Sequence, residues 1–183
     1  MSRGMSRSGT QTRYAGAIKT ERCILNRLVS NDRDQVCRLR TDPEVRRYLG
    51  GPTEEAKFES QFLHMLGPCL DHYWAVRGAV DQAFIGLVSL DLSQIEIDTE
   101  VSYEFLPEYW GKGFATESVG AVVDFALADP SINRVVAETQ AANWPSRRLL
   151  DRVGLHLIES IDRFGEEQVI YATKPGQLSD NST

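Results

Sequence analysis

A glycine turn near the middle of the chain carries the most specific chemistry in the sequence. The turn Gly111-Lys-Gly113 follows an alternating stretch at 100–105 and precedes apolar residues at helical spacing from Ala115 to Ala126. The pattern predicts a strand, a tight turn and a helix in succession. First-turn amides have no acceptor within a helix, and the helix dipole favours an anion there. Because glycines let the backbone approach a ligand closely, we expect this turn to bind a diphosphate.

Two common phosphate-binding motifs do not fit the turn. The P-loop requires the pattern G-x-x-x-x-G-K-[ST], and its four spacer residues are missing here. The dinucleotide fingerprint requires a third glycine or an alanine, and Thr116 holds that position. An unrelated nucleotide-binding α/β protein is therefore disfavoured.

A second polar constellation begins about thirty residues further along, on the next predicted strand–helix unit. Residues 133–139 predict a strand, and Asn143 and Ser146 precede a helix with apolar residues at Leu149, Leu150 and Val153. Gly154 is expected to end that helix. Asparagine is a preferred N-cap, and this role would also place Asn143 at the open end of the helix.

Together the two constellations resemble the motifs of the GCN5-related N-acetyltransferases (GNAT), which bind acetyl coenzyme A (acetyl-CoA). Residues 110–115 are similar to motif A, Q/R-x-x-G-x-G/A, with Trp110 where Gln or Arg is commoner. The stretch 143–155 is similar to motif B, although its ending Val-Gly-Leu departs mildly from the usual Leu-Gly-Phe. The sequence of residues 107–117 resembles that of the branch named for the ribosomal-protein N-terminal acetyltransferases. The resemblance extends over about residues 20–173.

The resemblance implies an α/β (α+β) fold. Its central sheet is mixed and mostly antiparallel, with about seven strands splayed between the fourth and fifth and about four flanking helices. Pantetheine is then expected in the wedge, bonded to the backbone of Phe105 and Leu106, with the diphosphate on the amides that follow. The residues implied in donor binding are Phe105, Leu106, Trp110, Gly111, Lys112, Gly113, Phe114, Ala115, Thr116, Asn143 and Ser146.

The chemistry of acetyl transfer makes separate demands on the site. An amine must be neutral to attack, which costs about 1 kcal/mol for an α-amino group at pH 7 and about 4.6 kcal/mol for a lysine. Glu100 and Glu104 are four residues apart on the predicted strand and so share a face. Glu100 matches a glutamate of the family segment, and we expect it to act as a base or a substrate anchor; the alternative is an ordinary surface carboxylate.

The departing thiolate needs a proton or a hydrogen bond. Many members of the family place a tyrosine seven residues after the motif-B asparagine, but this chain has Leu150 there. Ser146 is therefore the expected donor to sulfur. A backbone amide of the fourth strand would stabilise the oxyanion.

The elements that position these residues follow from hydrophobic periodicity. Strands are predicted at 18–28, 73–76, 84–90, 155–158 and 168–171, in addition to those at 100–105 and 133–139 described above. Helices are predicted after Asn31-Asp32 and from 53 to 66. Asp42-Pro43 is expected to cap a further helical start between the first two helices. Gly86 within a strand predicts a bulge or a close backbone approach.

The bulk composition suits one domain of a globular protein. The chain has 183 residues, of which 42% are hydrophobic and 25% are charged. It contains no run of about 18 apolar residues, the length needed to span a membrane. Residues 1–16 are expected to be a disordered tail, 17–174 a single domain and 175–183 a flexible tail. The net charge of −6 does not favour nucleic-acid binding. Three unpaired cysteines indicate a reduced, cytoplasmic protein without a metal site.

The expected function is transfer of an acetyl group from acetyl-CoA to a primary amine, by direct attack in a ternary complex. The acceptor could be a protein N-terminus or a small molecule, and the enzyme a monomer or homodimer. The alternative is a non-catalytic acyl-CoA-binding module or sensor of the same fold.

Overall fold

The computed structural model describes residues 16–67, 72–92 and 98–174. The tails expected at 1–16 and 175–183 lie outside these ranges, apart from Gly16. None of the helices in the described part of the chain has the length and apolar character needed to cross a membrane.

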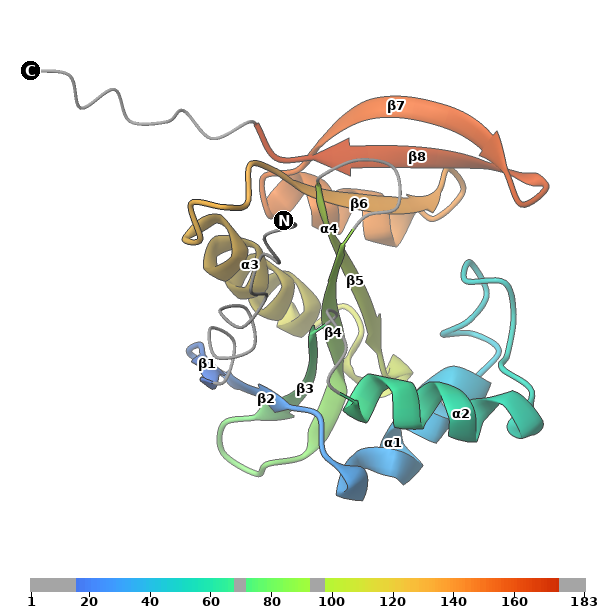
Figure 1. Cartoon of the computed structure of the whole chain (residues 1–183), viewed down its shortest axis with the longest axis vertical. Coiled ribbons are helices and arrows are strands. Elements are labelled where there is room, and N and C mark those ends of the chain that lie inside the picture. Colours follow the sequence, from blue (N-terminus) through green and yellow to red (C-terminus); the bar gives the residue numbers. More distant parts are fainter. Residues whose placement is uncertain (1–15, 68–71, 93–97, 175–183) are drawn as a thin grey trace, which may run out of the picture.

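One mixed sheet runs through the protein, with the strand order β1-β2-β3-β4-β5-β6-β8-β7 (Figure 1). Its strands are β1 (Ile18–Lys19), β2 (Cys23–Arg27), β3 (His72–Gly78), β4 (Phe84–Leu92), β5 (Thr99–Phe105), β6 (Val135–Gln140), β7 (His156–Arg163) and β8 (Glu166–Ala172). The eighth strand arises because the first predicted strand is divided by a turn at 20–22 into β1 and β2. Neighbouring strands pair antiparallel except β5 and β6, which are parallel.

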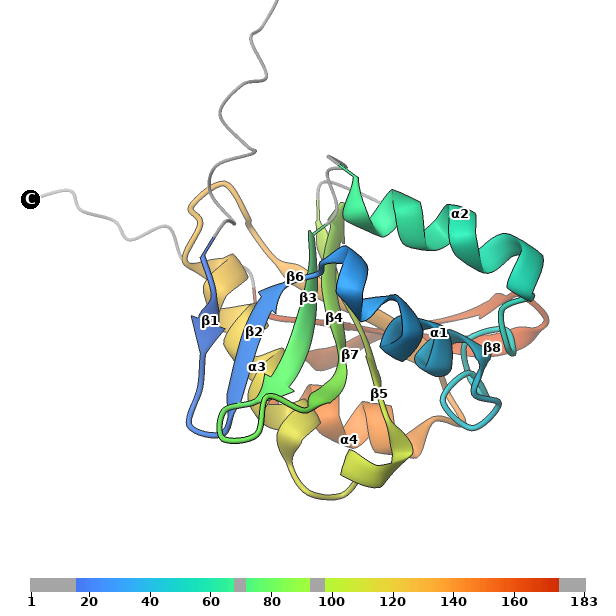
Figure 2. The same ribbon diagram turned by 90° about the horizontal axis from the view of Figure 1, so that it is seen from below.

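In the described part of the chain, four α-helices cover the two faces of the sheet (Figures 1 and 2). They are α1 (Arg33–Thr41), α2 (Glu55–Leu66), α3 (Phe114–Leu127) and α4 (Trp144–Arg152), with short 3₁₀ turns η1 (Ser30–Asp32) and η2 (Pro107–Tyr109). The apolar stripes of α3 and α4 pack against one face, with Val119, Val122 and Leu150 in that core. Those of α1 and α2 pack against the other face, with Leu39, Phe58 and Phe62 in a second core. The expected mixed, mostly antiparallel fold with four helices is confirmed.

The segment after α1 differs from the prediction. The Asp42 side chain does cap the chain, because its Oδ1 accepts from the amides of Glu44 and Val45 at 2.8 and 3.0 Å. Residues 43–50 nevertheless form successive turns and no regular helix. Gly50 and Gly51, with φ of 79° and 84°, change the direction of the chain between these turns and α2.

The sheet opens between β5 and β6. The two strands pair only at Thr99–Val135 and Glu100–Val136, and beyond this point they diverge (Figure 1). These are the fourth and fifth strands of the sequence prediction, so the expected splay is confirmed. Thr99 donates its amide to Arg134 on the β6 side, whereas Leu106 donates to Ile85 on the β4 side. Because amides alternate along a strand, those of Tyr103 and Phe105 face the opening.

Gly86 lies where β4 passes closest to the end of β5. A Cβ atom there would be 2.5 Å from the Glu104 carbonyl and 2.6 Å from the Phe105 ring. The close backbone approach predicted from the sequence is therefore present, and it lets the Phe105 ring pack directly on β4.

Candidate active site

The glycine turn joins the end of β5 and η2 to the start of α3. Gly111 and Gly113 have φ of 70° and 83°, a left-handed conformation that side chains rarely adopt. Gly113 is the N-cap of α3, and the first helical bond runs from the Glu117 amide to the Gly113 carbonyl at 3.0 Å. The amides before Glu117 therefore have no helical acceptor. The turn is exposed, so an anion can reach them.

Trp110 reaches back to the opening in the sheet. Its indole Nε1 donates to the Phe105 carbonyl at 2.7 Å, and its amide donates to Pro107 at 3.1 Å. Of the two residues expected to bond pantetheine, Phe105 has its amide towards the opening. Leu106 has its amide bonded to Ile85 at 3.0 Å and its side chain buried.

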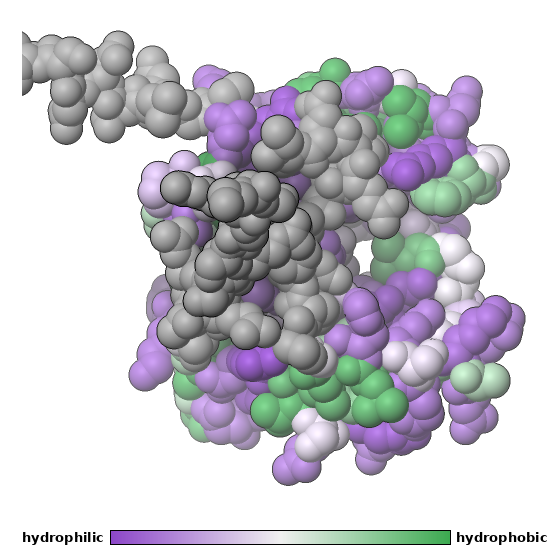
Figure 3. Space-filling model, viewed as in Figure 1, coloured by the Kyte–Doolittle hydropathy of each residue, from purple (hydrophilic) through white to green (hydrophobic). Residues whose placement is uncertain are grey.

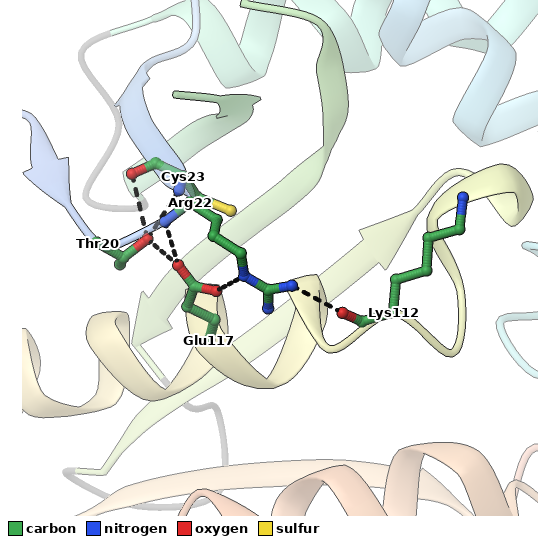
Figure 4. Close-up of polar contacts among 5 residues, drawn as sticks. All are labelled: Thr20, Arg22, Cys23, Lys112 and Glu117. Atoms are coloured by element: carbon green, nitrogen blue, oxygen red, sulfur yellow. Dashed lines mark hydrogen bonds and ion pairs between the residues drawn. The ribbon is translucent and has the colours of Figure 1, made fainter. Parts of the chain in front are cut away.

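Arg22 holds the glycine turn from outside α3, a role that the sequence analysis missed. Its Nε donates to Glu117 Oε2 at 2.7 Å and its Nη1 to the Lys112 carbonyl at 3.0 Å (Figure 4). The guanidinium lies 4.7 Å from the centre of the Phe114 ring. Lys112 points its own side chain away from this cluster (Figure 4). Arg22 thus ties the β1–β2 turn to the turn expected to bind phosphate.

Glu117 is the shared hydrogen-bond acceptor of this cluster. Its Oε1 accepts from Thr20 Oγ1 at 2.6 Å and from the Arg22 amide at 2.7 Å. Burial alone would raise the pKa of Glu117, but the hydrogen bonds from Thr20 and Arg22 outweigh it and hold the pKa below its ordinary value. The carboxylate stays charged and neutralises Arg22. In the sequence, nothing distinguished Thr20 and Arg22 from the other polar residues of the first predicted strand, such as Lys19 and Arg27.

Asn143 is the N-cap of α4, as predicted. Its Oδ1 accepts from the Ser146 amide at 3.3 Å, while its Nδ2 donates to Thr139 Oγ1 at 3.1 Å. Gly154, with φ of 85°, ends the helix, and Leu155 bonds back to the Leu150 carbonyl at 3.0 Å.

Tyr103 and Ser146 meet across the opening between β5 and β6. The Tyr103 hydroxyl lies 2.7 Å from Ser146 Oγ, which joins β5 to α4. Burial, with a smaller contribution from Tyr171, raises the pKa of Tyr103 to about 12 although the Ser146 hydrogen bond opposes it. The phenol is therefore protonated near pH 7 and able to donate a hydrogen bond. Sequence analysis named Ser146 but not Tyr103, because it searched for a tyrosine at the position of Leu150, which is fully buried.

Glu100 lies on the other face of β5, half-buried among carboxylates. Burial, followed by the nearby charges of Glu138 and Asp91, raises its pKa to about 6, although Arg163 opposes this. Asp91 is directly opposite Glu100 in the β4–β5 ladder. Glu138 lies on β6 and forms an ion pair with Arg163 at 2.9 Å. A carboxylate with this pKa is charged at neutral pH yet basic enough to accept a proton.

Glu104 shares that face with Glu100 but has a different environment. Its carboxylate is buried and contacts Arg40 Nη1 at 3.2 Å and Arg46 Nη1 at 3.3 Å. The two glutamates share a face of β5, as predicted, but their surroundings differ. The half of this face around Glu100 is acidic, and the half around Glu104 is basic. Within the described ranges there is no group of three histidine, cysteine or acidic residues arranged to hold a metal ion.

Comparison with known proteins identifies the fold family. Residues 22–156 match the family described as Acetyltransferase (GNAT) domain, which is most of the chain. The chain belongs to the GNAT acetyltransferase family. It is 28% identical over 140 residues to the uncharacterized N-acetyltransferase p20 of Bacillus licheniformis, covering 73% of this chain and 79% of that protein. It is 27% identical over 145 residues to the uncharacterized N-acetyltransferase YoaA of Bacillus subtilis, covering 75% and 81%.

Solved GNAT structures share the fold with this chain. A GNAT-family acetyltransferase from Bacillus anthracis superposes with a TM-score of 0.75 at 21% identity, covering 86% of this chain and 97% of that one. Spermidine N-acetyltransferase from Vibrio cholerae, in complex with CoA and spermine, gives 0.74 at 18% identity, covering 84% and 95%. Aminoglycoside acetyltransferase AAC(6')-Ib, in complex with coenzyme A, gives 0.72 at 14% identity, covering 83% and 94%. The GNAT fold thus serves very different acceptors, so fold alone does not select one.

Proposed function

We propose that this GNAT protein transfers the acetyl group of acetyl-CoA to a primary amine by direct attack in a ternary complex. The observation that carries the proposal is the continuity of the donor site. The amides of Tyr103 and Phe105 face the opening between β5 and β6, and the opening leads to the glycine turn at the start of α3. This arrangement fits an extended pantetheine chain that ends in a diphosphate.

The residues present fit acetyl-CoA as donor substrate in three places. Gly111 and Gly113 leave room for the diphosphate, since side chains are absent and a Cβ at Gly111 would meet nothing within 4 Å. The first-turn amides of Phe114, Ala115 and Thr116 supply hydrogen-bond donors, with Lys112 beside them. Asn143 and Ser146 lie at the start of α4, where Ser146 contacts Tyr103 across the opening.

Glu100 is proposed as the base that prepares the acceptor. When acetyl-CoA is bound it supplies an activated thioester, and the amine must reach it without its extra proton. Glu100 is ionised above a pKa of about 6 and can accept that proton, directly or through water. The nitrogen–carbon bond forms as the carbon–sulfur bond breaks.

The Tyr103–Ser146 pair is proposed to supply the leaving group with a proton. Tyr103 is protonated at neutral pH and hydrogen-bonded to Ser146. Either hydroxyl can donate a hydrogen bond to the sulfur as the carbon–sulfur bond breaks; a proton given to the thiolate passes along the pair and is restored to it from water. The structure thus offers a phenol for the role although Leu150 stands where a tyrosine was sought in the sequence.

The test is a titration followed by a turnover assay. Calorimetry should show binding of acetyl-CoA and CoA but weak or no binding of ATP; equal affinity for ATP would contradict the donor site. A panel of primary amines is then screened for CoA release. Acetyl-CoA binding without turnover on any amine would favour the non-catalytic acyl-CoA module.

The proposal also covers the branch of the family, the location in the cell and the oligomeric state. Membership of the ribosomal-protein N-terminal acetyltransferase branch is supported by the sequence of residues 107–117. A cytoplasmic location is supported by Cys23 and Cys37, which are free thiols. Size-exclusion chromatography would decide between monomer and homodimer.

A further inference from the structure

A hollow lies among α1, α2, β3 and the 43–50 turns, on the face of the sheet opposite α3 and α4. It has a volume of about 350 Å³ and is lined by Arg40, Arg46, Tyr73 and polar residues of α2 that include Gln61 and His64. In the space-filling view the molecule is notched between the C-terminal strands and the α1–α2 layer (Figure 3). The donor site uses none of these residues.

The walls of this hollow carry an excess of positive charge. Arg40 and Arg46 both contact one carboxylate, that of Glu104, at 3.2 and 3.3 Å. The pKa of Arg46 is lowered by burial and by the nearby Arg40, although Glu104 opposes this. One carboxylate therefore faces two guanidinium groups that repel each other.

The two arginines differ in how their donors are used. Arg46 is held by three contacts: Nε to the Gly51 carbonyl at 3.1 Å, Nη2 to the Leu49 carbonyl at 2.6 Å, and Nη1 to Glu104. Arg40 Nε is buried, and no group in the described part of the chain accepts its hydrogen. Glu104 Oε2 is likewise buried without a donor among the described residues, in a side chain that is 8% exposed. Buried polar atoms normally have partners, so the hydrogen-bonding capacity of this cluster is not fully used within the described residues. The Arg40 side chain, which is 19% exposed, lines the hollow and is the group that a ligand can reach.

The strand register connects this hollow to the proposed reaction site. Tyr73, Ser89 and Ser102 lie directly opposite one another on β3, β4 and β5. Two strand spacings separate Tyr73 from Ser102, which is about 10 Å. Ser102 is exposed and stands between Glu100 and Glu104 on the same face. Glu100 and Glu104 are about 13 Å apart along the strand.

We propose that this hollow binds a carboxylate on the acceptor, so that the acceptor is an amine whose far end is acidic. Its carboxylate binds Arg40. Its reactive amine then extends along β5 towards Glu100. The inference rests on the proposed function only in treating this ligand as the acceptor; the carboxylate site itself is tested by binding alone.

Three ligands that differ by one group each provide the probe. L-Lysine has a side-chain amine, an α-amino group and a carboxylate. 6-Aminohexanoate lacks only the α-amino group, and cadaverine lacks only the carboxylate. Calorimetry with CoA present measures their binding without turnover. We expect lysine and 6-aminohexanoate to bind at least about fivefold more tightly than cadaverine, the size expected for one charge-assisted pair at a partly exposed arginine.

Arg40→Gln should remove this preference while leaving CoA affinity unchanged, and Arg40→Lys should retain part of it. Arg33→Gln is the matched control, because Arg33 is on the same helix but contacts Glu59 and Asp34. A melting curve checks that each variant is folded.

The proposal is overturned if cadaverine binds as tightly as 6-aminohexanoate, if neither carboxylate binds, or if the preference survives Arg40→Gln. Carboxylate binding that depends on Arg40, with no acetylation of any amine, would contradict the proposed function and leave the carboxylate site standing.

Discussion

The two sides of β5 are built in different ways. On the donor side, the glycine turn and the start of α3 present backbone amides, and the residues concerned are neighbours in the sequence. On the acceptor side, charged side chains meet from α1, the 43–50 turns, β4, β5, β6 and β7. Backbone amides suit a diphosphate that is the same in every turnover. Side chains can change without changing the fold, which suits an acceptor that differs between relatives.

The charge of the two sides also differs. On the donor side, the charged residues that support the turn are Arg22 and Glu117, which form an ion pair at 2.7 Å. The acceptor side has an acidic half around Glu100 and a basic half around Arg40 and Arg46. An acceptor with an amine at one end and a carboxylate at the other matches both halves, whereas a polyamine matches only the acidic half.

The largest expected effect tests the backbone nature of the donor site. Gly113→Glu puts a side chain and a negative charge where the diphosphate approaches, at a φ of 83° that also strains any side chain. We expect CoA binding to become undetectable by calorimetry with the circular dichroism spectrum unchanged. Gly165→Glu is the control, because Gly165 has a similar φ of 78° in a turn away from the site. Normal CoA affinity in Gly113→Glu would refute the phosphate-binding role.

Glu100→Gln tests the acidic half of the acceptor side. If Glu100 is the base, kcat should fall by about 10²-fold at pH 7, and the loss should shrink at higher pH as free amine becomes abundant. In the unmodified enzyme, activity should be present above the pKa of about 6 and lost below it, since only the ionised carboxylate accepts a proton. Steady-state kinetics from about pH 5 to 9 measure this. A raised KM with unchanged kcat would instead make Glu100 an anchor, and unchanged kinetics at every pH would make it a surface carboxylate.

Arg22→Ala would show how far the donor side depends on a distant residue. Without the contacts to Glu117 and Lys112 the turn loses a support, and we expect about tenfold weaker CoA binding. Pantetheine, which lacks the diphosphate, should bind equally well to both proteins. Arg27→Ala, on the exposed end of β2, is the matched control. If CoA and pantetheine weaken together, Arg22 supports the fold and not the diphosphate site.

The smallest expected effect is a shift of the pH profile. Glu138 raises the pKa of Glu100 through its charge, and it also neutralises Arg163. Glu138→Gln should therefore lower the pKa of Glu100 and move the acidic limb of kcat to lower pH, with little change at pH 8. An unmoved limb would mean that another group controls it.

Much of the donor side could be predicted from the sequence because its structure is local. The turn at Gly111 and Gly113, the cap at Asn143 and the helix end at Gly154 follow from backbone rules that act within a few residues. The mixed, mostly antiparallel sheet and its opening were expected from resemblance to a family, and the structure confirmed them. The break between β1 and β2 was not predicted, since polar contacts with α3 override the local pattern there. The turns at 43–50 were not predicted either, although the Asp42 cap that precedes them was.

The remaining contacts depended on the tertiary structure. Arg22 and Glu117 are 95 residues apart, Arg46 and Glu104 are 58 apart, and Tyr103 and Ser146 are 43 apart. No spacing in the sequence connects them. The sequence placed Glu100 on a strand, but its raised pKa depends on which residues of β4 and β6 lie beside it. By itself the sequence determined the glycine turn that we propose as the phosphate site, because backbone geometry of this kind is local. Only the tertiary structure decided the charges that face the acceptor, because these are set by strand register and by helices that pack from elsewhere in the chain.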